Sequence, residues 1–130
     1  MDTKFLCPYC RSLLNLDGNI ILTAETQKGK KGLVLLHQEV GNYSALHDPS
    51  FNLKKHEKVD FFCPVCHESL QYDKNKNLVK IIMKEENNES IILFSNIYGE
   101  KCTYVIQDKD MKSYGESVKK YTNPDWFLDT

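Results

Sequence analysis

The residues with the clearest chemical potential are four cysteines in two Cys-Pro-x-Cys elements. The first element is CPYC (7–10) and the second is CPVC (63–66), with 52 residues between them (11–62). Two thiolates spaced in this way can turn toward one ion while the intervening amides point at the sulfurs. Two such knuckles facing each other form the tetrahedral sulfur cage that zinc prefers, with Zn–S distances of about 2.3 Å. The predicted metal ligands of one Zn²⁺ per chain are Cys7, Cys10, Cys63 and Cys66.

Four thiolate ligands leave no open position on the ion, so the predicted site is structural rather than catalytic. Without a cation the thiolates would repel one another, and metal binding is therefore expected to be coupled to folding. The sequence contains no P-loop, G-x-G-x-x-G, H-E-x-x-H, G-x-S-x-G or paired-carboxylate arrangement. We therefore expect no catalytic residues and no organic cofactor, and we predict that the protein is not an enzyme.

Other interpretations of the cysteines stay open. A pair of redox C-x-x-C motifs would need a βαβ context, which this sequence lacks. Disulfides are disfavoured because five cysteines is an odd number. The fifth cysteine, Cys102, is interpreted as a small apolar strand residue, since no base is placed beside it. His67 directly follows a ligand and could support or replace one, but solvent exposure is the favoured interpretation.

The cysteines lie within a weak internal repeat. Each knuckle follows an apolar pair, Phe5-Leu6 or Phe61-Phe62, and each is followed by a leucine at the same offset, Leu14 or Leu70. Apolar, β-branched runs separated by polar turns come next. These runs are Ile20–Thr26 and Leu33–His37 in the first half, and Leu78–Met83 and Ile91–Ile97 in the second. Each half is therefore predicted to be a knuckle plus a β-hairpin, with pseudo-repeats at about 5–40 and 61–98.

The remaining segments add a strand and a short helix. Residues 41–57 are long for a loop and are expected to contain some local structure. The alternation of Cys102–Gln107 indicates another strand. Ser113–Tyr121 is predicted to be a short helix, with Ser113 and Glu116 as a capping box. The Trp126-Phe127-Leu128 group either packs on the sheet or anchors a partner.

The predicted fold class is thus mostly β, or small α+β, with six or so strands and a short C-terminal helical segment. The length of 130 residues predicts a single domain over 1–130, and a chain of this size can bury a core.

The two knuckles resemble those of the zinc-ribbon or rubredoxin-like family of four-cysteine proteins. The resemblance covers residues 5–36 and 61–97, and it implies one bound zinc, or iron as in rubredoxins. The usual knuckle reads CPxCG, but here Arg11 and His67 occupy the glycine positions. A tight turn facing the sulfurs favours glycine, so this departure disfavours the iron-containing, electron-transfer version.

Composition and charge favour a protein partner over a nucleic-acid partner. The formal net charge is -1, and Arg11 is the only arginine. Arginine is the preferred bidentate hydrogen-bond donor to phosphate groups and to guanine, so its scarcity disfavours nucleic acid as a partner. Binding of Zn²⁺ by four thiolates would lower the net charge to about -3, which disfavours it further. The basic clusters Lys28–Lys31 and Lys54–Lys58 could contact phosphates, but solvated turns are the favoured interpretation.

No apolar run is long enough for a signal peptide or a membrane-spanning helix, so a cytoplasmic, reducing location is expected. We expect a non-enzymatic zinc-binding protein that serves as an interaction or regulatory module for another protein. The alternatives are a nucleic-acid-binding zinc ribbon and a redox or electron-transfer protein.

Overall fold

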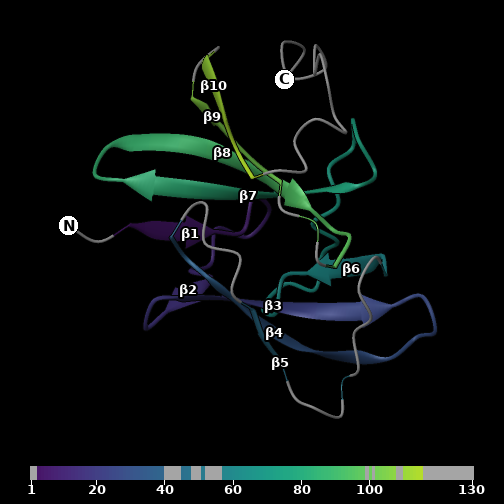
Figure 1. The fold of residues 1–130 in the computed structure, drawn as a ribbon. Helices are drawn as coiled ribbons and strands as arrows, with labels where there is room; N and C mark the ends of the chain where they lie inside the picture. Colours follow the sequence, from purple (N-terminus) through teal and green to yellow (C-terminus); the bar gives the residue numbers. More distant parts are fainter. Residues whose placement is uncertain are drawn as a thin grey trace.

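The computed structural model describes residues 3–39, 45–47, 51, 57–98, 100, 102–107 and 110–115. In these residues the chain forms β-strands and no helix, and all strand pairings between named strands are antiparallel (Figure 1). The strands are β1 (Lys4–Leu6), β2 (Asn15–Leu16), β3 (Asn19–Thr26), β4 (Lys31–His37), β5 (Ala45–His47), β6 (Val59–Phe62), β7 (Leu78–Glu85), β8 (Asn88–Ser95), β9 (Thr103–Gln107) and β10 (Asp110–Tyr114). The prediction of a mostly β class is confirmed for this part of the chain.

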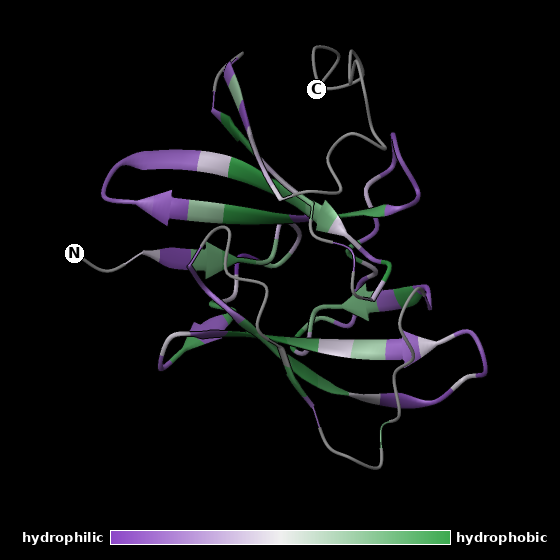
Figure 2. Ribbon diagram, viewed as in Figure 1, coloured by the Kyte–Doolittle hydropathy of each residue, from purple (hydrophilic) through white to green (hydrophobic). Residues whose placement is uncertain are grey.

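The strands form two sheets, and each sheet contains strands from both halves of the sequence. The β7 sheet has the order β1-β7-β8-β9-β10, and the β3 sheet has the order β2-β3-β4-β5 with β6 also paired to β3. The knuckle strand β1 pairs with β7 of the second half, and the knuckle strand β6 pairs with β3 of the first half. The two halves therefore exchange strands, and their main hairpins end in hydrophilic tips on opposite sides of the molecule (Figures 1 and 2).

The pairing registers of the two halves correspond. Phe5 lies opposite Met83, which lies opposite Ser90 on β8. In the other half, Phe61 lies opposite Ala24, which lies opposite Gly32 on β4.

The correspondence continues to the next strand of each sheet. Val34 pairs with His47 on β5, and Ile92 pairs with Val105 on β9. The shared pairing scheme thus extends through β5 and β9, beyond the two hairpins expected from the sequence. Strand β5 lies within the 41–57 connection, where local structure was expected.

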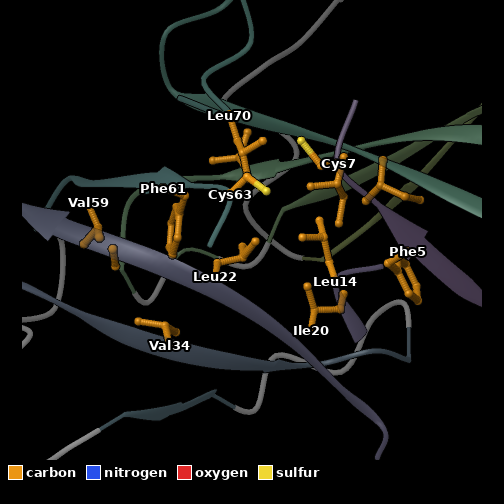
Figure 3. Close-up of a cluster of buried hydrophobic side chains, with 14 of the residues drawn as sticks. Phe5, Cys7, Leu14, Ile20, Leu22, Val34, Val59, Phe61, Cys63 and Leu70 are labelled. Atoms are coloured by element: carbon orange, nitrogen blue, oxygen red, sulfur yellow. The ribbon is translucent and has the colours of Figure 1, made fainter. Parts of the chain in front are cut away.

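The main core lies between the two sheets. Along β3, alternate side chains (Ile20, Leu22 and Ala24) are buried, as a strand with one covered face requires. They pack in one cluster with Val79, Ile81 and Ile92 of the β7 sheet and with Leu14 and Leu70 behind the knuckles. Cys7 and Cys63 belong to the same cluster (Figure 3). Each fully buried aliphatic side chain contributes about 1.5–3 kcal/mol, so this core holds both knuckles in place.

A second cluster lies on the other face of the β7 sheet. Its buried members are Tyr72, Leu78, Leu93, Cys102, Tyr104 and Ile106. The alternation predicted for Cys102–Gln107 is confirmed, because Val105 packs against the main core while Tyr104 and Ile106 are buried in the second cluster.

The predicted C-terminal helix is not supported. Its first residues, Ser113 and Tyr114, belong to strand β10 and pair with Tyr104 and Thr103 of β9. Pairing with a neighbouring strand satisfies the backbone groups that a local capping box would otherwise satisfy, so tertiary context prevails over the local signal. The rest of the predicted helix and the Trp126-Phe127-Leu128 group lie outside the described residues.

The described part of the chain also has more strands than the six or so expected. Strands β1, β2, β5 and β6 contain two to four residues each, and β10 is mostly exposed and polar. Segments this short do not show a periodic pattern of apolar residues, so composition alone could not identify them.

Candidate metal centre

Each knuckle is held by the same set of backbone hydrogen bonds. In the first knuckle the amide of Leu14 donates to the carbonyl of Phe5 at 2.7 Å, and that of Arg11 donates to the carbonyl of Cys7 at 3.0 Å. In the second knuckle Leu70 donates to Phe61 at 2.9 Å and His67 donates to Cys63 at 3.0 Å. These bonds close both turns in the same way, so the two pairs of cysteines have equivalent local geometry.

The structure brings all four predicted ligands together. The four cysteine Sγ atoms lie within 4.8 Å of one another. The Sγ atoms of Cys7 and Cys66 are 3.7 Å apart, and those of Cys10 and Cys63 are 3.8 Å apart. A tetrahedron with metal–sulfur bonds of about 2.3 Å has edges of about 3.8 Å, whereas a disulfide bond is about 2.05 Å long. The observed distances fit a four-thiolate metal site, and all five cysteines are free.

Backbone amides point at the sulfurs. Cys7 Sγ accepts the N–H groups of Tyr9 and Cys10 at 3.4 and 3.5 Å. Cys63 Sγ accepts those of Val65 and Cys66 at 3.3 and 3.4 Å. Such donors stabilise the ionised form of a thiol, which is the form that binds a metal.

The surroundings of three of these thiols shift their pKa values in different directions. Burial raises the pKa of Cys7. The hydroxyl and backbone amide of Ser12 lower the pKa of the exposed Cys10 to about 6. The amide of Glu68 acts in the same direction on Cys66, but burial and the other three sulfurs raise its pKa to about 12. Four adjacent thiolates therefore need a cation to neutralise their repulsion, as expected for a site whose formation is coupled to folding.

The two positions where the family pattern has glycine adopt a left-handed conformation. Arg11 has φ 63° and His67 has φ 66°, so both residues adopt a backbone conformation that normally favours glycine. His67 is exposed, in agreement with the favoured interpretation, and the grouped ligands among the described residues are the four cysteines alone.

Arg11 forms a bidentate ion pair with Glu89 at the start of β8. The Nη1–Oε1 distance is 3.1 Å, and Nη2 contacts Oε2. This contact raises the pKa of Arg11 and lowers that of Glu89. The pair links the first knuckle to the hairpin of the second half. Sequence reasoning missed Glu89, because only the exchange of strands brings it to the knuckle.

Cys102 lies apart from the metal centre, in the second core cluster. It is 1% exposed, and burial raises the pKa of its thiol to about 11. A thiol that stays protonated at neutral pH is a poor nucleophile. The structure therefore supports the interpretation of Cys102 as a small apolar residue, but it lies immediately before β9 and not within a strand.

Lys28, Lys30 and Lys31 are exposed at the tip of the β3–β4 hairpin. In the second basic cluster, residues 54–56 lie outside the described residues. No helix in the described part of the chain is long and apolar enough to cross a membrane.

Comparisons of the chain with protein-family models, with curated proteins and with solved structures found no match.

Proposed function

We propose that Cys7, Cys10, Cys63 and Cys66 bind one Zn²⁺ ion, and that the metallated fold serves as a non-enzymatic module that binds another protein. The arrangement of the four sulfurs carries the metal part of this proposal, since the Cys7–Cys66 and Cys10–Cys63 Sγ distances match the edges of a tetrahedral thiolate site. Zinc suits such a closed site because it requires no open position and no redox change. The ion would join one knuckle from each half and neutralise the thiolates.

Metal analysis of the purified protein tests this part. We expect one zinc per chain and a colourless solution, and a strong chelator should release the metal and remove the cooperative thermal transition. The Cys63→Ser variant should lose both the metal and the transition. The Cys102→Ala variant is the matched control and should keep one metal. A red, iron-loaded protein would show that the bound metal is iron and not zinc. A wild-type protein that folds without metal would contradict the structural role of the site.

Exposed apolar side chains support a protein partner. Tyr9 and Val65, at equivalent places in the two knuckle turns, are 60% and 58% exposed. Leu33 and Leu46 on the β3 sheet are exposed as well. Exposed apolar and aromatic groups favour contact with another protein surface over contact with a phosphate backbone.

Binding of fluorescent DNA and RNA, measured between 50 and 200 mM salt, separates the two partner classes. We expect no salt-sensitive binding. Salt-sensitive binding that is lost in a Lys30→Glu, Lys31→Glu variant would contradict the proposal of a protein partner and indicate a nucleic-acid partner.

A further inference from the structure

A hollow of about 780 Å³ lies at one end of the space between the two sheets. Its apolar floor is formed by Phe5, Met83 and Val105, all of which belong to the main core or pack against it. The end of β4 and strands β9 and β10 also line the hollow. It therefore has an apolar floor beside the main core and a rim of exposed residues.

The corresponding place in the other half is filled. By register, Met83, Ser90 and Val105 correspond to Ala24, Gly32 and His47.

There the ring of Phe51 lies directly on Gly32, so that a Cβ atom added to this glycine would lie 2.9 Å from the ring. The Phe51 ring also meets the ring of His47 edge to face, with centroids 6.3 Å apart, and Phe51 is buried. In the first half the chain thus fills the site with an aromatic side chain of its own, whereas in the second half the equivalent site is open.

Ser90 provides a polar group at this open site. It lines the hollow and is only 8% exposed. A hydroxyl in the lining of the hollow can donate a hydrogen bond to a polar group of a ligand or accept one from it.

The rim of the hollow is acidic. Among the described residues, three carboxylates (Glu39, Glu85 and Asp110) and one cation (Lys112) line it. The three carboxylates and the one lysine give a formal charge of about -2, which favours a cationic ligand. The chain's own Trp126-Phe127 group has Asp125 and Asp129 beside it, so its charge is unsuited to this rim.

We propose that the hollow binds an aromatic side chain of a partner protein, presented on a segment with basic residues beside it. The ring would occupy the site that Phe51 occupies in the other half, and the basic side chains would contact the carboxylates of the rim. This inference rests on the protein-binding part of the proposed function, but it does not depend on the identity of the metal.

The test uses the full-length, metal-loaded chain labelled with ¹⁵N and the peptide acetyl-Lys-Phe-Lys-amide as the probe. We expect saturable shifts of the amide signals of Ser90, Val105 and Gln107, with weaker binding at higher salt. Acetyl-Lys-Ala-Lys-amide should bind about ten-fold more weakly or worse, because it lacks the ring that would be buried. Acetyl-Glu-Phe-Glu-amide should not bind.

Two variants locate the binding. Glu85→Gln should weaken the binding of the Lys-Phe-Lys peptide about two- to five-fold, as expected for an exposed ionic contact. Asp73→Asn is the matched control, because it removes the same charge from an exposed turn away from the hollow. Ser90→Phe should place a ring of the chain's own over position 90, where the ligand ring would lie, and abolish binding, with its fold checked by metal content. If this variant does not fold, the Glu85 and Asp73 pair still decides the question.

Absence of saturable shifts with the Lys-Phe-Lys peptide, or equal binding of the Glu-Phe-Glu peptide, would overturn the proposal. A Trp126→Ala, Phe127→Ala variant tests the chain's own aromatic residues as the occupant. If it shifts the signals of the hollow without peptide and also increases peptide affinity, the occupant is this segment and not a partner. A chain that binds one metal but no peptide contradicts this inference while leaving the metal site intact.

Discussion

The two halves of the molecule pair their strands in the same register but cover them differently. On the outer face of the β3 sheet, Leu33 and Leu46 are exposed. On the β7 sheet, Leu93 and Tyr104 are buried in the second core cluster. On the faces that the two sheets turn toward each other, the β3 sheet is the more fully covered. Phe51 fills the site over Gly32, whereas the site over Ser90 is open. The pairing scheme and the knuckles are thus common to both halves, and the surfaces available to a partner differ between them.

The largest predicted effects concern positions where the halves agree. Leu14 and Leu70 occupy the same place behind each knuckle and are 2% and 1% exposed. Leu14→Ala and Leu70→Ala should each destabilise the metal-loaded protein by about 2–5 kcal/mol, because each leaves a cavity in the main core. Urea denaturation of the two variants measures this. A loss well under 1 kcal/mol in either variant would show that the two knuckles are not supported by one core.

The next prediction concerns positions where the halves differ. Leu93 is fully buried, and the residue at the corresponding register position on β4, Leu35, is only partly buried. Leu93→Ala should cost about 2–5 kcal/mol. Leu35→Ala should cost clearly less, about 1 kcal/mol, because less apolar surface returns to water. Denaturation under one set of conditions compares them, and equal losses would mean that the outer face of the β3 sheet is covered.

A smaller difference is expected between Gly32 and Ser90. Gly32→Ala places a Cβ atom 2.9 Å from the Phe51 ring, so it should destabilise the protein by about 1–3 kcal/mol. Ser90→Ala should be close to neutral, because it removes only one oxygen atom at a place that borders open space and creates no steric overlap. Melting temperatures of the two variants test the contrast between a filled and an open site. A large loss from Ser90→Ala would show that its hydroxyl has a partner within the chain.

Much of the fold and the metal centre could be predicted from local patterns. The spacing of Cys7, Cys10, Cys63 and Cys66 predicted the group that the structure assembles. The long apolar runs predicted β3, β4, β7 and β8 to within a few residues. The turn of Asp17 and Gly18 between β2 and β3 has positive φ at both residues, as a tight hairpin turn requires.

What could not be predicted depends on contacts distant in the sequence. No local pattern shows that β1 pairs with β7 instead of β3, or that Glu89 lies beside Arg11. Strand β10 carries a local signal for a helix start and becomes a strand only because β9 pairs with it. The hollow is likewise lined by several segments far apart in the sequence, and Phe51 occupies the corresponding place in the other half only because the two halves share their strand register.

The smallest predicted effect compares the two left-handed positions of the knuckles. His67→Gly should stabilise the metal-loaded protein by about 1 kcal/mol, because glycine adopts φ near 66° without the steric penalty of a side chain. Arg11→Gly relieves the same penalty but removes the ion pair with Glu89, so its gain should be smaller. Urea denaturation at low and high salt measures the difference, which should shrink as salt screens the pair. Equal gains at low salt would show that the Arg11–Glu89 contact does not stabilise the junction between the halves.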